Sequence, residues 1–206
     1  MKHIDDSGIA ENTLVIYVTD NGWIQTENAG YAPRSKRSPN EGGTRTPIMF
    51  RWPGTIPAAD RPELCSSIDI VPTILAAASA KGPHDFPGLN LLPNLKSGKP
   101  IKRNTLFGES FAHDIADIEK PQASLLYRWV IRGHDKLLLT YDGEINRYKS
   151  THPRTEKRPQ LFNLATDPWE KKNLAADNPR VVKRLVGKIA DWYPLKERTS
   201  RTRWKP

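Results

Sequence analysis

The chain has 206 residues, of which 37% are hydrophobic and 27% charged. This balance allows one domain with a buried core, plus at most a small appendage, and excludes a disordered chain. The net charge of +9 favours an anionic partner or substrate without choosing among them. The most apolar run, residues 68–80, is interrupted by Asp69, Pro72 and Ser79. No run therefore reaches the roughly 18 apolar residues of a membrane span.

Cys65 is the only cysteine, which excludes a disulfide within the chain and a cysteine-rich zinc site. It lies beside an apolar stretch and is expected to be a buried structural thiol. The first residues, Met1 to Asp6, contain no apolar segment of the signal-peptide type, and a predicted strand follows soon after. We therefore expect the chain to be one piece of a longer polypeptide.

The first predicted strand, Thr13 to Thr19, is a β-branched and aromatic run of the kind found buried on both faces of a parallel sheet. The turn residues Asp20, Asn21 and Gly22 end it, at the strand end where α/β sheets place their ligands. The two oxygen-bearing side chains suit Ca²⁺ or Mg²⁺, although calcium takes about 6–8 oxygens. Taken alone, the tripeptide is only a turn signal.

The next segments alternate between loop and regular structure. Residues 28–45 are rich in Gly, Pro, Ser and Arg and predict a loop, and Pro47 to Trp52 predicts a second strand. A helix is predicted from Asp69, which can cap its free N–H groups, to about Ala80, with Pro72 in the first turn. Residues 82–102 read as a connector punctuated by Pro and Gly.

The second half predicts a small sheet with one helix. Three strands are expected, at Thr105 to Phe111, Ser124 to Ile131 and Lys136 to Tyr141, with a polar loop over 142–159. A final helix opens with Asn178 as N-cap and Pro179 at its first position, and Pro194 stops it. Its apolar face is formed by Val182, Leu185, Val186, Ile189 and Tyr193.

This order predicts an α/β fold in two parts, the edge of an α/β sheet with helices and then a small antiparallel sheet packed by one helix. The expected boundaries are 1–103 for the α/β part, 104–195 for the small α+β subdomain and 196–206 for a solvated basic tail.

The predicted loop around Lys36 is strongly basic. Residues 30–51 contain five basic residues against the single acid Glu41. Such a loop could hold an oxyanion by charge and by backbone N–H groups, and the Gly42–Gly43 pair permits tight backbone geometry. As an isolated motif it is equally typical of a solvated basic loop.

Together, these segments resemble the sulfatase family of the alkaline phosphatase superfamily. The resemblance covers about residues 4–194, and five segments that carry it follow one another in the family's order. They are Asn12 to Gly22, Lys36 with Glu41 to Pro47, Ser67 to Leu75, Gly88 to Pro93 and Gln160 to Leu174.

The resemblance implies roles for individual residues. The positions of Asp20 and Asn21 are calcium ligands in the family, and the position of Lys36 contacts the sulfate group. The ion and the lysine place positive charge where negative charge develops. Roles in shaping the loop fall to Glu41, Gly42, Gly43 and Arg45.

The chain also departs from the family pattern. The family's nucleophile is a formylglycine made within a Cys/Ser-x-Pro-x-Arg motif, and no such motif occurs here, since Cys65 is followed by Ser-Ser-Ile-Asp. The paired aspartates that complete the calcium shell would precede residue 1, and Asp5–Asp6 favours a solvated helical face instead. We therefore expect the C-terminal portion of a sulfatase, with half a calcium site and no activity alone, because such parts act as a unit.

His113 follows a predicted strand and is a second substrate-binding candidate, although an exposed or satisfied histidine is the competing interpretation. The remaining histidines have no metal-ligand spacing to one another.

In an intact relative the implied reaction is hydrolysis of a sulfate ester on a sugar or aryl alcohol, so the expected partner is a sulfated small molecule or carbohydrate. One alternative is a phosphoester or phosphonate hydrolase of the same superfamily, although those enzymes tend to carry His where Asn21 stands. Another is a non-catalytic basic module that binds polyanions, but the basic residues are dispersed, which disfavours nucleic acid. Export to the periplasm or cell exterior is expected by family analogy, and the oligomeric state stays open.

Overall fold

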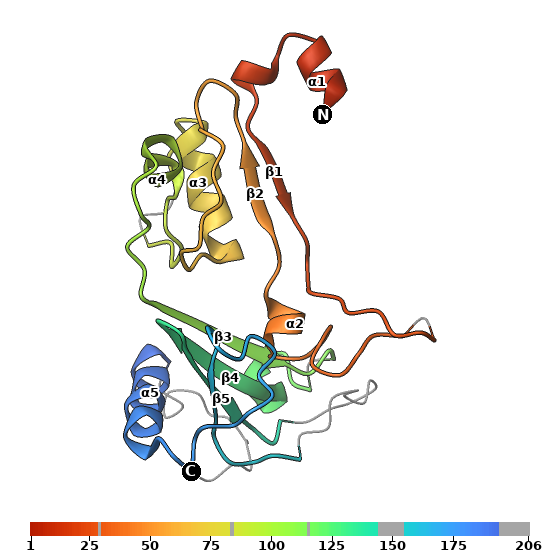
Figure 1. The fold of residues 1–206 in the computed structure, drawn as a ribbon, viewed down its shortest axis with the longest axis vertical. Helices are drawn as coiled ribbons and strands as arrows, with labels where there is room; N and C mark the ends of the chain where they lie inside the picture. The colour runs from red at the N-terminus through yellow and green to blue at the C-terminus, as the bar shows by residue number, and fades with distance from the viewer. Residues whose placement is uncertain (29, 83–84, 115, 144–154, 194–206) are drawn as a thin grey trace. The chain divides into compact units, whose positions relative to one another are not determined.

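A computed structural model describes residues 1–28, 30–82, 85–114, 116–143 and 155–193 (Figure 1). They form two compact units, which are described separately. Unit 1 comprises Met1–Asp20 and Thr46–Asn104, and unit 2 comprises Asn21–Arg45 together with the described part of Thr105–Pro206. The domain limits expected from the sequence stay predictions, and the predicted basic tail lies outside the described residues.

The strands of unit 1 are β1 (Val15–Val18) and β2 (Ile48–Arg51), both at predicted positions. They pair antiparallel, with Val15 opposite Arg51. The expectation of a parallel strand buried on both faces is therefore wrong within the described residues. Tyr17 is 54% exposed and Met49 58% exposed, because β1 has β2 as its only partner strand there and their outer face is uncovered.

The start of unit 1 is helical. Helix α1 (Lys2–Asp6) is followed by the 3₁₀ turn η1 (Ala10–Asn12). Asp6 pairs with Lys2 at 2.6 Å, and Asp5 pairs with Arg51 at 2.6 Å, on side chains that are largely exposed. The prediction that Asp5–Asp6 belongs to a solvated helical face is confirmed.

Asp69 organises the helical part of unit 1 through its carboxylate. The 3₁₀ turn η2 (Ser67–Asp69) leads into α3 (Ile70–Ala77). The buried carboxylate accepts hydrogen bonds from the backbone N–H groups of Ser66 at 2.8 Å and Leu89 at 2.7 Å, and pairs bidentately with Arg103 at 2.6 and 2.7 Å.

Two details of the predicted helix are corrected. The Asp69 side chain does not cap α3, because a capping box directs it back to Ser66. The helix ends at Ala77 rather than Ala80, since Ser79 adopts a left-handed φ of 53°. Burial favours a raised pKa for Asp69, but the hydrogen bonds from Arg103, Leu89 and Ser66 outweigh it and hold the pKa below the usual value.

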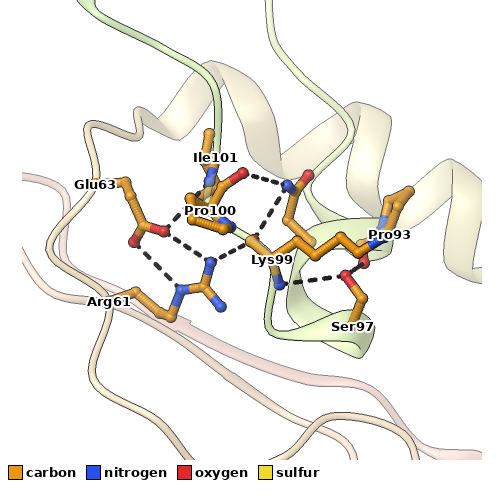
Figure 2. Close-up of polar contacts among 8 residues, drawn as sticks. Arg61, Glu63, Pro93, Ser97, Lys99, Pro100 and Ile101 are labelled. Atoms are coloured by element: carbon orange, nitrogen blue, oxygen red, sulfur yellow. Dashed lines mark hydrogen bonds and ion pairs between the residues drawn. The ribbon is translucent and has the colours of Figure 1, made fainter.

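The predicted connector contains a further short helix, α4 (Leu92–Ser97), which ends at Gly98 in a left-handed cap. Figure 2 shows the polar contacts around its end. Arg61 donates to Glu63 and to the carbonyl oxygen of Lys99, at 2.8 and 2.7 Å. The backbone N–H of Ile101 donates to Glu63. These contacts hold the residues after α4 against the segment that contains Arg61 and Glu63.

Unit 2 is built on a four-stranded antiparallel sheet in the order β3-β4-β5-β6. Figure 1 labels the first three of these strands. The strands are β3 (Thr105–Phe111), β4 (Leu125–Arg132), β5 (Asp135–Thr140) and β6 (Gln160–Asn163), and the 3₁₀ turn η3 (Pro121–Ser124) precedes β4. The small antiparallel sheet is therefore confirmed, with β6 added to the three predicted strands.

Helix α5 (Pro179–Trp192) packs on this sheet as predicted, with Leu185 and Ile189 buried. The shared core comprises Leu125, Val130, Leu137, Leu139, Tyr141, Leu161, Leu185 and Ile189. Arg128 of β4, 1% exposed, donates to the carbonyl oxygens of Ile189 at 2.9 Å and Tyr193 at 2.7 Å. The Ile189 carbonyl oxygen also accepts the N–H of Tyr193 at 3.2 Å, so Arg128 adds side-chain hydrogen bonds that tie the end of α5 to β4. The predicted stop at Pro194 lies outside the described residues.

Side chains alternate between the two faces of a strand, so Lys136 and Leu138 lie on the face of β5 opposite to the α5-facing Leu137 and Leu139. Leu138 packs there with Ala112, Leu126 and Tyr127. This second face matters for the site, because it presents Lys136. Among the described residues, no helix has the length and apolar character to cross a membrane.

Candidate functional site

The two predicted metal ligands, Asp20 and Asn21, are consecutive in the chain. Asp20 follows β1 at the end of unit 1 and is exposed, whereas Asn21 opens unit 2 and is half-buried. The Asn21 side-chain amide donates to the carbonyl oxygen of Gly22 at 3.0 Å, which leaves its side-chain oxygen as the group available to a cation.

The turn after Asn21 lies backbone against backbone with the basic loop. The N–H of Gly22 donates to the carbonyl oxygen of Gly43 at 2.9 Å. A Cβ on Gly22 would lie 2.2 Å from the carbonyl oxygen of Gly42, and one on Gly43 would lie 2.3 Å from that of Ser35. Only glycine permits such approaches. The predicted tight geometry of the glycine pair is therefore present, within the short helix α2 (Glu41–Thr44), which interrupts the predicted loop.

Lys36 lies in a segment of defined but unusual backbone. Ser35 is fully buried, and its hydroxyl accepts a hydrogen bond from the N–H of Ile24 at 2.6 Å. Arg34 and Arg37 adopt left-handed φ angles of 61° and 65°, which are uncommon for residues other than glycine. Such conformations persist only where the surrounding structure enforces them, and they cluster at functional sites.

Trp23 joins Lys36 to the Asn21 turn. The Lys36 ammonium lies 5.0 Å from the centroid of the Trp23 ring, which is in turn 5.4 Å from the Tyr31 ring. Contacts of a cation with an indole face are attractive, by about 0.5–1 kcal/mol at exposed sites. The sequence analysis missed Trp23, although an aromatic residue directly after a turn of candidate ligands was a usable signal.

The basic loop is also anchored to the C-terminal sheet. The Lys136 ammonium lies 2.8 Å from Glu41 Oε1 and 3.0 Å from Glu170 Oε1. Glu170 Oε2 accepts a hydrogen bond from the backbone N–H of Glu41 at 2.6 Å. The contact supports the shaping role expected for Glu41. The sequence analysis assigned no role to Lys136 or Glu170, although a lysine within an apolar strand was a signal.

His113 lies elsewhere in unit 2. It is exposed, follows β3 and lines a cavity of about 490 Å³ together with Glu109, Gln122 and Tyr193. None of these residues belongs to the Lys36 segment. The role of His113 in substrate binding therefore stays a prediction.

The oxygen atoms of Asp20 and Asn21 have the chemistry that hard cations prefer, but they supply only part of a coordination shell. Within the described ranges, no three His, Cys, Asp or Glu side chains gather as a metal site would require. Cys65 is half-buried, and burial together with the nearby charge of Asp69 raises the pKa of its thiol. A raised pKa is the opposite of what activates a cysteine nucleophile.

Comparisons with known proteins identify sulfatases as the relatives of this chain. The Sulfatase family profile matches residues 1–80. An uncharacterized sulfatase, YdeN, of Escherichia coli is 28% identical over 93% of this chain and 37% of its own length. Human arylsulfatase A is 29% identical over 90% of this chain and 38% of its own length. The chain thus spans well under half the length of these relatives.

Solved structures share the fold. A sulfatase structure described within glycosaminoglycan metabolism of Bacteroides thetaiotaomicron superposes with a TM-score of 0.71 at 24% identity, covering 93% of this chain and 41% of that one. The phosphonate monoester hydrolase of Silicibacter pomeroyi gives 0.67 at 21% identity, covering 97% and 38%. The predicted α/β fold class, part of an alkaline-phosphatase-like sheet with a small antiparallel sheet after it, is confirmed.

Proposed function

Because the chain belongs to the sulfatase family, we propose that it supplies the sulfate-binding lysine and two metal ligands of a sulfate ester hydrolase. The observation that carries the proposal is the cluster in which Lys36 contacts Trp23 and the turn after Asn21 is hydrogen-bonded to the same loop. The names of its relatives, arylsulfatase A and a sulfatase of glycosaminoglycan metabolism, favour an aryl or sugar sulfate as the substrate class.

Lys36 has the central role in this proposal. Its ammonium donates hydrogen bonds to the oxygens of the sulfuryl group and offsets the negative charge of the ester and of its transition state. The Trp23 ring limits where the ammonium can lie. A lysine held in place before the substrate arrives loses less conformational entropy on binding than a mobile surface lysine.

Asp20 and Asn21 are proposed to contribute oxygen ligands to Ca²⁺. When bound, such an ion supplies Lewis-acid neutralisation of the sulfate oxygens. The remaining ligands and the formylglycine nucleophile must come from polypeptide outside this sequence, which contains no Cys/Ser-x-Pro-x-Arg motif. The chain alone is therefore proposed to be inactive. Export from the cytoplasm, expected from the family, also stays a prediction.

Calorimetry with Ca²⁺ and turnover of an aryl sulfate test this function. Both are measured on the chain alone and on a longer polypeptide that joins it to a nucleophile-bearing segment, each with Lys36→Ala and Asn21→Ala variants. We expect tight Ca²⁺ binding and turnover only in the longer protein, and loss of turnover in Lys36→Ala. Ester hydrolysis by the short chain alone would show that the nucleophile lies within these 206 residues.

The phosphonate monoester hydrolase among the structural neighbours keeps a second function in view. Asn21 favours a sulfatase, since phosphoester and phosphonate hydrolases tend to carry His at that position. Turnover of matched aryl sulfate and aryl phosphonate esters decides between them, and a preference for the phosphonate would reverse the assignment.

A polyanion-binding module without catalysis remains the third candidate, because the net charge is +9. Binding of that kind weakens steeply as salt rises and depends on many basic residues together. Heparin binding that is unchanged by Lys36→Ala and abolished by moderate salt would favour such a module.

A further inference from the structure

We propose that Lys136 and Glu170 form a buried clamp that positions Lys36 for sulfate, so that the C-terminal sheet sets the geometry of the sulfate-binding loop. The inference rests on the function proposed above. All of its residues belong to unit 2.

The clamp holds the Lys36 segment at both ends. On the C-terminal side, Glu41 bonds to Glu170 through its backbone N–H and to Lys136 through its carboxylate. On the N-terminal side, the Arg34 guanidinium donates a hydrogen bond to the carbonyl oxygen of Glu170. Lys36 lies between these two anchors, five residues before Glu41 and two after Arg34.

Both clamp residues are buried and conformationally constrained. Lys136 is 0% exposed, and its strand neighbours are Ile131 on β4 and Phe162 on β6, both buried. Glu170 is 1% exposed and adopts a left-handed φ of 56°, which a residue other than glycine keeps only under constraint. Lys136 lies on β5, an inner strand paired on both sides, so a shift of Glu41 would break its ion pair with a side chain that the sheet holds in place.

Stability alone does not account for these charges. Burying ions is costly, and replacing a buried ion pair by well-packed apolar residues is often neutral or stabilising. Here the Lys136 ammonium is shared between two carboxylates, those of Glu41 and the fully buried Glu170, so each charge depends on the position of the others. Directional groups of this kind fix geometry better than an apolar contact does, which is what a loop presenting a sulfate ligand requires.

The effect of the clamp extends to the Asn21 turn. Glu41 opens α2, whose Gly43 carbonyl oxygen accepts the hydrogen bond from Gly22. Ser35, beside Lys36, accepts the hydrogen bond from Ile24. Displacement of Glu41 would therefore move the Lys36 side chain and the turn that presents Asn21 at the same time.

The test compares Lys136→Met and the milder Glu170→Gln with the matched control Arg128→Met. Arg128 is an equally buried cation of the same sheet, but it holds the end of α5 and not the loop. Two readouts are taken on folded protein by NMR. The Trp23 indole resonance, assigned with Trp23→Phe, reports the Lys36 contact without ligand, and a titration with inorganic sulfate reports affinity.

We expect both clamp variants to shift the Trp23 indole resonance and to weaken sulfate binding about tenfold or more, since small misplacements of positioning groups have effects of this size. Lys136→Arg should restore part of the affinity. Arg128→Met should lower stability without changing either readout. If Glu170→Gln, folded, keeps the parent indole resonance and sulfate affinity, the clamp is refuted.

Failure of the underlying function has a different signature. In that case Lys36→Ala leaves the sulfate titration of the parent chain unchanged, while the ligand-free indole resonance still responds to Lys136→Met. A clamp without a sulfate site would then be the result.

Discussion

Removal of the Asp69 side chain is the perturbation whose size the structure defines best. Asp69→Ala leaves the guanidinium of Arg103, 10% exposed, without its bidentate partner, and leaves the N–H groups of Ser66 and Leu89 without their acceptor. Breaking a buried ion pair by removing one partner costs about 3–5 kcal/mol. The two N–H groups are only part-buried, so water can replace part of what they lose. We expect a loss of about 4 kcal/mol.

Urea unfolding followed by circular dichroism measures this loss. With a slope of about 2 kcal/mol per molar urea, the midpoint should fall by about 2 M. The control is Asp6→Ala, which breaks an exposed pair with Lys2 in the same unit and should cost about 0.5 kcal/mol or less.

A double variant separates two effects of Asp69→Ala, the loss of the charge partner of Arg103 and the loss of side-chain volume. Asp69→Ala combined with Arg103→Met removes the unpaired guanidinium and should recover part of the stability. The reasoning fails if Asp69→Ala unfolds at the midpoint of the Asp6→Ala control, or if the double variant is less stable than Asp69→Ala alone.

Three further predictions concern the pH dependence of Asp69, the packing of Gly43 and the reactivity of Cys65. The pKa of Asp69 is lower in the folded state than in the unfolded state. Its contribution to the free energy of unfolding is therefore complete above the unfolded-state pKa of about 3.9 and is lost as the pH falls through the folded-state pKa. The urea midpoints of the parent and Asp69→Ala should converge in acid. Gly43→Ala places a Cβ 2.3 Å from a backbone oxygen, so it should destabilise unit 2 by about 2 kcal/mol or more and weaken sulfate binding. Gly187→Ala, on the open surface of a helix, should be neutral or stabilising. Thermal unfolding compares the two variants, and equal effects on stability would contradict the packing argument. The thiol of Cys65, with its raised pKa, should react with a disulfide reagent more slowly than free cysteine at pH 7.5, and a faster reaction would show an activated thiolate.

The elements that the sequence predicted well are those with a strong local pattern. β3 matches its predicted bounds, and α5 starts at the predicted Pro179, because a proline in the first helical turn and an apolar helix face are signals that act over short distances. The expected side-chain cap by Asn178 is absent, since its amide donates to the carbonyl oxygen of Leu174 instead. Local pattern failed where long-range contacts decide. The pairing partner of β1 comes from residues 48–51. The carboxylate of Asp69 bonds to Leu89 and Arg103, 20 and 34 residues along the chain, and only its capping box with Ser66 is a local pattern.

The candidate site divides in the same way. Lys36 and the Asp20–Asn21 pair could be proposed from motif order, because their spacing is written in the chain. The clamp could not, because Glu41 and Lys136 are 95 residues apart and Arg34 and Glu170 are 136 apart. No periodicity connects residues at such separations. Lys136, a charged residue inside the apolar strand β5, was the one local sign of the clamp.

The sheet order bears on how unit 2 folds. Each strand of β3-β4-β5-β6 pairs with its neighbour in the chain, and β4 and β5 are joined by a two-residue turn. Local contacts of this kind form early, since little loop-closure entropy opposes them. The Lys36 segment, by contrast, reaches the sheet from about a hundred residues upstream. We expect it to dock last during refolding, so that sulfate binding appears in a later kinetic phase than the sheet itself.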